Sequence, residues 1–409
     1  MQKQTISPAL TLLALAISAF AIGSTEFISV GLMPLLVKSF GITLSQAGLT
    51  VSMYALGITV GAPVLTILTG SWQRKTLMLA IMVTFIIGNL LAAFAPFYSV
   101  LLLGRIIAAL AHGIFMSVAS IIAADVVQPA KRASAISVMF TGLTVATVTG
   151  VPLGTFIGQH FSWHWSFIFI AFIGLIGLIA NYFLVPDKLP IPGKTDLKGF
   201  VRIFKNPPLV IALLITALGY GGTFTAYTYL TPILENLLHF SANAVVVILI
   251  VYGLMVAIGN TLGGRFANLN PLNALLNMFI GLALSLFLLF LTLHNQYLGL
   301  FAILLMGLFA FMNVPGLQLY IVQLAEKYTP KDTTLASALN ISAFNVGITI
   351  GSFTGSQVTA HLGIAFTPLF GIIMVILAIL LTGYLIKMAH QEKKRPAINS
   401  QNTCSVNDN

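Results

Sequence analysis

The sequence predicts an all-α membrane protein with twelve transmembrane helices, arranged as two parallel repeats of six. Of 409 residues, 58% are hydrophobic and only 7% are charged, which a water-soluble fold of this length does not tolerate. Apolar runs of about 20 residues, long enough to cross a hydrocarbon core of ~30 Å, recur along the whole chain. A shift of 201 positions aligns the chain with itself: Asp125 with Glu326, Pro129 with Pro330, Gly150 with Gly351, Gly154 with Gly355, and His160 with His361. Six spans per copy bring both repeats into the membrane from the same side.

Each predicted span is a continuous apolar run. The first six runs cover 9–33, 45–69, 77–95, 99–124, 134–158 and 165–185. The other six cover 209–232, 243–266, 272–293, 297–321, 336–359 and 365–387. We therefore predict an N-terminal bundle over residues 1–185 and a C-terminal bundle over 209–388. The first run leads directly into the second span, so we interpret it as an uncleaved helix and not as a signal peptide.

Two segments lie outside the bundles. Residues 186–208 are rich in Pro and Lys, and we expect them to form a cytoplasmic linker with a solvated or lipid-surface helix. Residues 389–409 are polar and lack apolar periodicity, which predicts a disordered cytoplasmic tail. The only cysteine, Cys404, lies in this tail, so the chain has no internal disulfide.

Lysine and arginine alternate between the spans so that nearly all of them fall on one side of the membrane. Basic residues collect in cytoplasmic loops, and both termini are therefore predicted to be cytoplasmic. The opposite loops hold Lys38 and Glu235 as their charged residues. This topology, with contact to anionic lipid headgroups, accounts for the net charge of +10 without a nucleic-acid partner. The basic set comprises Lys3, Arg74, Lys75, Lys131, Arg132, the linker residues, Arg265, Lys327, Lys331 and Lys387 through Arg395.

Small residues recur at every fourth position in the fifth and eleventh spans. They are Gly142, Ala146, Gly150, Gly154 and Gly158 in the fifth, and Ala343, Gly347, Gly351 and Gly355 in the eleventh. Small residues at this spacing let two membrane helices approach closely. We expect these faces to form the seam between the halves along which the halves move, with a bend at Pro152.

Two ionisable residues lie well inside the predicted spans, the acid Glu26 and the base Arg105. Each is six or seven residues from the outer end of its helix, so both lie about 10 Å below the outer surface and are expected to meet. Intramembrane charges are costly and functional by default, so Glu26 is the candidate proton carrier. The alternative is a static ion pair. His112, two turns from Arg105, is either a proton relay or solute contact, or a packed histidine bonded to a carbonyl.

The second half carries neutral residues where the first is charged. The 201 shift places Met306 opposite Arg105 and Asn313 opposite His112. Aromatic and amide side chains there predict an uncharged polar solute with hydroxyls or an aromatic ring. Each of them is equally well placed to be an interhelical contact. The substrate-binding candidates are Tyr54, Tyr220, Tyr227, Tyr229, Asn313, Gln318, Asn340, Phe344 and Asn345.

Several of these segments resemble known motifs. Residues 142–158, G-L-T-V-A-T-V-T-G-V-P-L-G-T-F-I-G, resemble the antiporter motif of the major facilitator superfamily. Residues 101–113, L-L-L-G-R-I-I-A-A-L-A-H-G, resemble the fourth-helix motif of that superfamily, whose arginine is associated with proton coupling. The loop after the second span matches the superfamily only at its basic end, since Gly70 stands where an aspartate is expected. The second-half copy, Gly263, Gly264, Arg265 and Asn268, also lacks the acid.

Four shorter motifs narrow the resemblance to one group within the superfamily. They are T-E-F at 25–27, A-H-G at 111–113, T-A-Y-T-Y-L at 225–230 and A-S-A-L-N-I-S-A-F-N at 336–345. Together they resemble the bacterial sugar-efflux and arabinose-efflux-permease group of drug:proton antiporters. This resemblance implies proton-coupled export of a small neutral solute, such as an arabinose-type sugar or a chloramphenicol-like compound, across a bacterial inner membrane.

Two other functions remain open at this point: an uptake symporter on the same scaffold, and a membrane-embedded enzyme or sensor that uses Glu26, Arg105 and His112 as acid-base groups. The expected partners are a small solute, protons and lipid, with the chain acting as a monomer. No cofactor is predicted, because the chain has no phosphate-binding glycine loop. His160 and His164 have helical metal-ligand spacing but lack further ligands, so no metal is predicted.

Overall fold

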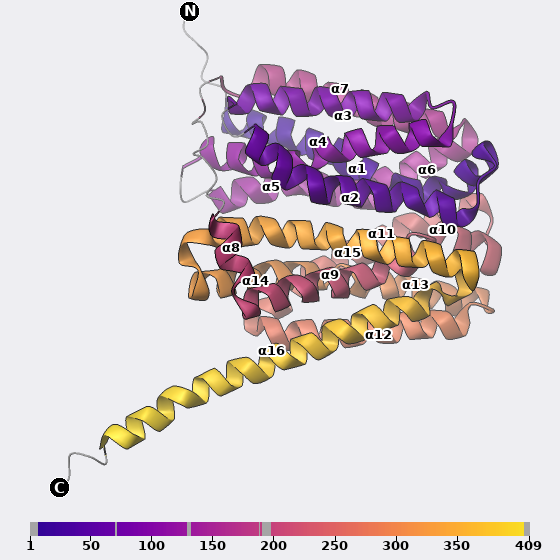
Figure 1. The fold of residues 1–409 in the computed structure, drawn as a ribbon. Coiled ribbons are helices and arrows are strands. Elements are labelled where there is room, and N and C mark those ends of the chain that lie inside the picture. The colour runs from indigo at the N-terminus through magenta and orange to yellow at the C-terminus, as the bar shows by residue number, and fades with distance from the viewer. Residues whose placement is uncertain (1–6, 70–71, 129–131, 188, 190–197, 405–409) are drawn as a thin grey trace, which may run out of the picture.

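The two predicted halves form adjacent groups of roughly aligned helices (Figure 1). The computed structural model describes residues 7–69, 72–128, 132–187, 189 and 198–404. Over these residues the chain is helical and contains no strand. The predicted all-α fold is therefore confirmed.

Local sequence signals mark several helix ends in the N-terminal half. Gly41 closes the first helix in the left-handed conformation, at φ 62°, and Thr43 with Gln46 forms a capping box at the start of the second. A π-helical turn interrupts the fifth span directly before Pro152, whose ring has no N–H to donate, so the predicted interruption at this proline is present. The elements are α1 (Pro8–Phe40), α2 (Leu44–Leu68), α3 (Arg74–Ala93), α4 (Tyr98–Asp125), α5 (Arg132–Val145), η2 (Ala146–Gly150), α6 (Val151–His160) and α7 (Trp163–Leu184).

The C-terminal half repeats this plan after the short linker helix α8 (Lys198–Phe204). The tenth predicted span is divided at residues 311–312. The elements are α9 (Pro207–Tyr227), α10 (Leu230–Pro232), η3 (Ile233–Leu237), α11 (Ala242–Leu269), α12 (Pro271–Thr292), α13 (Gln296–Ala310), α14 (Asn313–Tyr328), η4 (Pro330–Asp332), α15 (Thr333–His361), η5 (Ile364–Phe366) and α16 (Thr367–Cys404).

The C-terminal tail differs from the prediction. Residues 389–404 continue α16 beyond the bundle (Figure 1), and 405–409 lie outside the described residues. A helix that is already nucleated gains one hydrogen bond for each residue added, and the Gln, Glu, Lys and Arg residues here favour helix. Polar composition therefore did not prevent helix formation.

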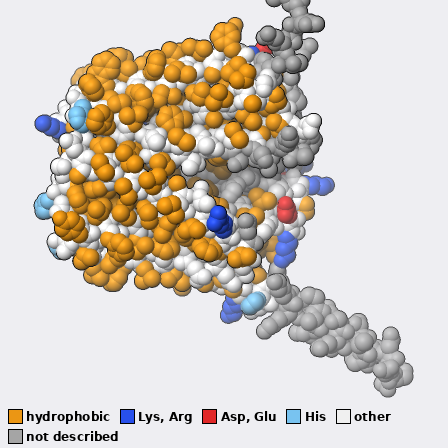
Figure 2. All heavy atoms as spheres, turned by 180° about the vertical axis from the view of Figure 1, so that it is seen from behind, with side chains coloured by type: hydrophobic (Ala, Val, Ile, Leu, Met, Phe, Trp, Pro, Cys, Tyr) orange, Lys and Arg blue, Asp and Glu red, His pale blue; other side chains and the backbone are white. Residues whose placement is uncertain are grey.

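The flank of the bundle has the character of a membrane-embedded surface. Within the described residues, 11 helical segments are long and apolar enough to cross a bilayer, and α2 is a further helix of 25 residues. Hydrophobic side chains cover most of the face in Figure 2, and basic side chains are few on it. Large apolar side chains such as Phe183, Leu284 and Leu380 are more than 60% exposed. The chain is therefore a multi-pass membrane protein.

The glycine faces pack inside each half, which corrects the prediction that they form the seam. In the N-terminal half, a side chain at Gly142, Gly150, Gly154 or Gly158 would strike α1. In the C-terminal half, a side chain at Gly347, Gly351 or Gly355 would strike the backbone of α9. Close backbone approach needs small residues wherever two membrane helices cross, so the spacing identified a contact but not the partner helix.

The halves meet along other faces of the same helices. Ser45 of α2 faces Ser356 of α15, and Ser52 faces Ser352, each pair with hydroxyl oxygens 2.8 Å apart. Gly253 of α11 packs against the backbone of η2 at Val148. Tyr229, after α9, lies between α2 and α15, where Gly48 and Gly355 leave room for its ring. The serine and tyrosine contacts lie toward the end where α2 begins.

The other end of the bundle, which we call the basic end, carries the start of α1, the extension of α16 and the linker helix α8 (Figure 1). Arg74 of α3 pairs with Asp125 of α4, and Lys75 Nζ lies 2.8 Å from Asp187 Oδ1. In the second half, Arg202 of α8 donates to both carboxylate oxygens of Asp332, at 2.7 and 2.6 Å. The loop position Gly70 and part of the predicted linker, 188 and 190–197, lie outside the described residues.

Candidate functional site

Arg105 connects three helices at the centre of the N-terminal half. Its side chain is fully buried on α4. The guanidinium donates from Nη1 to the Thr25 carbonyl at 2.5 Å and from Nη2 to the Glu26 carbonyl at 3.1 Å, both on α1. Nε donates to the Thr50 carbonyl of α2 at 3.4 Å. Arginine stays protonated in proteins, so Arg105 supplies a fixed positive charge and cannot itself carry a proton.

Glu26 meets Arg105 through its backbone and not through its carboxylate. In the part of the chain that the structure describes, the carboxylate makes no hydrogen bond or ion pair. It is half-buried and interacts electrostatically with Arg105, Tyr220 and Tyr227. The static ion pair considered from the sequence is therefore absent. The carboxylate remains available to bind a proton or a ligand group.

Tyr54 belongs to the charged cluster, although the sequence placed it with the substrate-binding residues. The Arg105 guanidinium carbon lies 4.1 Å from the centre of the Tyr54 ring, which is a cation–π contact. The Tyr54 hydroxyl is 3.2 Å from Nδ1 of His112. His112 is buried, and this contact orients it. Arg105, Tyr54 and His112 therefore form one continuous polar chain between α4 and α2.

An aromatic cluster joins the halves beside Glu26. Phe27, the next residue on α1, contacts Phe224 and Tyr227 of α9 with ring centres 5.7 and 5.9 Å apart, and Phe311 at 6.4 Å. Tyr227 also stacks on Tyr252 of α11 at 5.4 Å. The T-E-F motif contains Phe27, but nothing in that motif indicated that Phe27 meets aromatic residues of the other half.

Tyr220 and Phe344 extend this cluster into the C-terminal half. Their ring centres are 4.9 Å apart, and Tyr220 contacts Phe311 at 5.4 Å. Of the nine substrate-binding candidates, Tyr220, Tyr227 and Phe344 thus lie together. The position of Tyr229 between α2 and α15 is a packing contact between the halves, apart from this cluster.

Gln318 and Asn340 are joined to each other. Asn340 Nδ2 donates to Gln318 Oε1 at 2.8 Å, and Gln318 Nε2 donates to the Ser337 hydroxyl at 2.6 Å. The Thr216 hydroxyl donates to Asn340 Oδ1 at 2.7 Å. This network connects α9, α14 and α15 and occupies both carboxamides. These two residues therefore make an interhelical contact.

Asn313 and Asn345 each keep a free acceptor. Their amide nitrogens donate to carbonyls of preceding residues, Asn313 to Ala310 at 3.3 Å and Asn345 to Ile341 at 3.0 Å. Their Oδ1 atoms are buried without a hydrogen-bond partner among the described residues. The Tyr252 hydroxyl is in the same state. Buried polar atoms rarely remain unbonded, so a solute or water is the expected partner.

The polar network of α1 and α3 was missed in the sequence. The Thr25 hydroxyl donates to Asn89 Oδ1 at 2.9 Å, and Asn89 Nδ2 donates to the Phe85 carbonyl at 2.9 Å. The T-E-F motif includes Thr25, but Asn89 is a single amide in an apolar run and carries no pattern. At the end of the bundle opposite the basic end, His160 Nδ1 lies 3.0 Å from the Phe156 carbonyl and His164 Nδ1 lies 2.6 Å from the Ser162 hydroxyl.

Comparison with known proteins supports one family. The major facilitator superfamily model matches residues 15–329. The chain is 54% identical over 373 residues to the uncharacterized MFS-type transporter YtbD of Bacillus subtilis strain 168, covering 91% of this chain and 94% of that protein. It is 37% identical to the inner membrane transport protein YdhP of Escherichia coli K12, covering 90% and 94%.

Solved structures share the fold at low sequence identity. A D-xylose-proton symporter superposes with a TM-score of 0.75 at 16% identity, covering 91% of this chain and 97% of that one. A bacterial homologue of the human lysosomal transporter Spinster superposes with a TM-score of 0.70 at 14% identity, covering 93% and 98%. Together with the family match and the duplicated helical bundle, these likenesses establish that the chain is a transporter of the major facilitator superfamily.

Proposed function

We propose that this transporter is a proton-coupled antiporter that exports a small neutral solute, sugar-like or drug-like, by alternating access. We place it in a bacterial inner membrane with the basic end in the cytoplasm, and we keep the prediction from the sequence that both termini are cytoplasmic. The distribution of Lys and Arg supports this orientation. The relative YdhP is named as an inner membrane transport protein, which supports the location.

The unpaired carboxylate of Glu26 is the observation that carries this proposal. A carboxylate that is already held in an ion pair loses that partner when it takes up a proton. Glu26 has no such partner in the described structure, while Arg105 is satisfied by three backbone carbonyls. Glu26 can therefore gain and lose a proton without breaking the junction of α1, α2 and α4.

The position of Glu26 couples proton and solute. The adjacent Phe27 inserts among Phe224, Tyr227 and Phe311 of the other half, so a solute that enters this cluster displaces aromatic contacts beside the carboxylate. Proton and solute then favour different arrangements of the same junction, which is the condition for exchange. Each charge that crosses the membrane supplies about 2.3 kcal/mol per 100 mV.

The solute site that we propose lies between the aromatic cluster and the free acceptors. Tyr220, Tyr227 and Phe344 offer aromatic faces, and Asn313 and Asn345 offer unbonded Oδ1 atoms. This combination suits a solute with an apolar or aromatic face and hydrogen-bond donors. Gln318 and Asn340 hold helices together, and we leave them out of the proposed site.

The antiporter is tested in everted vesicles with an acid interior. Neutral sugars, nucleosides and chloramphenicol-like compounds are added outside while the pH gradient is recorded. Wild type is compared with Glu26→Gln and with Glu235→Gln, a control at a carboxylate in η3, outside the aromatic cluster. We expect one solute class to dissipate the gradient in wild type and in the control, and to have no effect in Glu26→Gln.

The other outcomes separate the remaining functions. An uptake symporter would carry protons inward with the entering solute and enlarge the gradient. Dissipation that persists in Glu26→Gln would remove Glu26 from coupling and contradict the mechanism. A solute that is chemically converted, with no gradient required, would contradict transport itself.

A further inference from the structure

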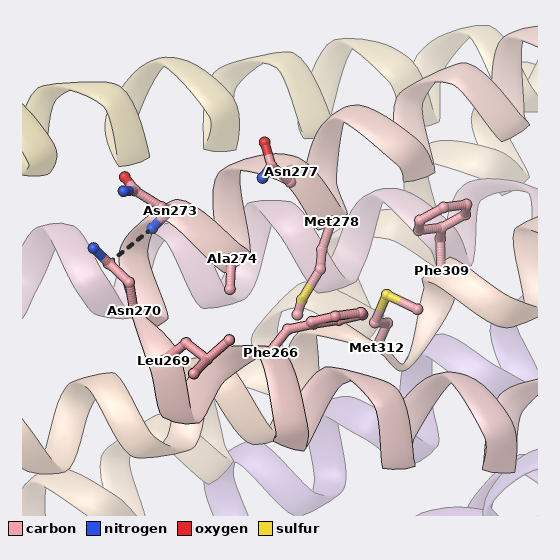
Figure 3. A pocket seen from close by; sticks show the side chains of 9 residues that line it. All are labelled: Phe266, Leu269, Asn270, Asn273, Ala274, Asn277, Met278, Phe309 and Met312. Atoms are coloured by element: carbon pink, nitrogen blue, oxygen red, sulfur yellow. Dashed lines mark hydrogen bonds between the residues drawn. The ribbon is translucent and has the colours of Figure 1, made fainter.

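A cavity on the flank of the C-terminal half has no role in the proposed transport path. It has a volume of about 490 Å³ and lies between α11, α12 and the junction of α13 with α14 (Figure 3). This volume is typical of sites that hold a small ligand. The lining consists of Phe266, Leu269, Asn270, Asn273, Ala274, Asn277, Met278, Phe309 and Met312.

The cavity is amphipathic. In Figure 3 the carboxamides of Asn273 and Asn277 lie on one side and the side chains of Phe266 and Met312 on the other. Asn273 and Asn277 are exposed and one helical turn apart on α12. Asn270 caps this helix by accepting from the Asn273 backbone N–H at 3.3 Å. The cavity therefore offers amide hydrogen-bonding groups beside an apolar wall at a helix end near the membrane surface.

Arg265 supplies a positive charge next to the cavity. It is exposed, precedes the lining residue Phe266, and lies one turn before Leu269 on α11. Among the described residues it makes no hydrogen bond and no ion pair. The first half differs, because the loop cations Arg74 and Lys75 there are both paired with aspartates.

The acid that corresponds to Asp125 is also unpaired. Glu326 aligns with Asp125 under the 201 shift, yet it is exposed and takes no part in an ion pair of the described structure. The C-terminal half therefore presents an open arginine and a cavity where the N-terminal half has a closed ion pair. An exposed arginine near a span end extends its charged group toward lipid headgroups.

We propose that this cavity binds an anionic phospholipid from the surrounding bilayer. Arg265 binds the phosphate, the carboxamides of Asn273 and Asn277 bond the remaining headgroup atoms, and an acyl chain covers the Phe266 and Met312 side. Basic pockets between helices at the cytoplasmic surface take headgroups of this charge. The apolar wall faces the hydrocarbon region, which supplies the chain.

Native mass spectrometry of the full-length protein, released from detergent in the presence of phosphatidylglycerol or phosphatidylcholine, tests this site. The variants are Arg265→Gln, which removes the charge, and Ala274→Phe, which fills the cavity and keeps the charge. Lys205→Gln is the control, because it removes an exposed charge at the same end but away from the cavity. Size-exclusion profiles show whether each variant is folded.

Wild type and Lys205→Gln are expected to retain phosphatidylglycerol more strongly than phosphatidylcholine. Loss of a charged hydrogen bond predicts binding about tenfold weaker or more in Arg265→Gln, and Ala274→Phe is expected to lose the bound lipid. Equal retention of both lipids, or no effect of Arg265→Gln, would overturn the headgroup assignment. Unchanged binding in Ala274→Phe would show a surface contact only and overturn the cavity site. Displacement of the lipid by a transported solute would assign the cavity to transport instead.

Discussion

Replacing Tyr54 with phenylalanine removes a single hydroxyl group from the polar chain that includes Arg105. The ring remains, and with it the cation–π contact at 4.1 Å. The hydrogen bond to His112 Nδ1 at 3.2 Å is lost. Because both residues are buried between α2 and α4, water does not readily replace this bond.

The hydrogen bond and the cation–π contact of Tyr54 contribute different amounts to the free energy of unfolding. Hydrogen bonds between membrane helices average about 0.6 kcal/mol and reach about 1.7 kcal/mol, so Tyr54→Phe is expected to lower the free energy of unfolding by an amount in this range. Tyr54→Leu also removes the desolvated cation–π contact, which contributes about 2 kcal/mol more. Leucine should therefore destabilise the protein clearly more than phenylalanine does.

The free energy of unfolding is measured in mixed micelles by denaturant titration followed by tryptophan fluorescence. Tyr384→Phe, at an exposed tyrosine on the lipid-facing flank of α16, is the matched control and should be neutral. A double-mutant cycle of Tyr54→Phe with His112→Leu should give a coupling energy in the hydrogen-bond range above. Additive single effects, or equal destabilisation by phenylalanine and leucine, would refute the proposed contacts.

Two further predictions concern the packing of α15 against α9 and the contact between the two halves at Ser52 and Ser352. Gly351→Ala places a methyl group against the backbone of α9, so we expect a loss of about 1–3 kcal/mol of stability, seen as a lower yield of monodisperse protein. Gly383→Ala, where a methyl group meets nothing, is the control, and equal yields would contradict the close helix contact. In a Cys404→Ser background, Ser52→Cys with Ser352→Cys should oxidise to a disulfide and stop transport until it is reduced. Transport that continues in the oxidised form would show that the halves need not separate at this contact.

The predictions of helices were reliable because hydrophobic length is a local property. A run of about 20 apolar residues is required to cross a bilayer whatever it packs against. The small-residue spacing was interpreted less well. It correctly indicated a close helix contact, but the partner of Gly150 is α1 of the same half. The residues on a helix face determine how closely another helix can approach, but they do not identify that helix.

In the candidate site, too, the sequence predicted some features and not others. Glu26 and Arg105 stood out because charges within apolar spans are costly, and the structure brings them together. Their contact runs through a backbone carbonyl, which no side-chain pattern encodes. Gln318, Asn340, Asn313 and Asn345 all carry a carboxamide, yet of these four only Asn313 and Asn345 keep a free acceptor.

By itself, the sequence determined the membrane class, the twelve helices, the duplication and the few residues that carry charge into the membrane. These follow from the transfer free energy and the length of each segment, which are local properties of the sequence. Only the tertiary structure decided which helix each glycine face meets, whether Glu26 is paired, and that Phe27 crosses between the halves. Those properties depend on distances between segments far apart in the chain, and such distances are set when all the helices pack together.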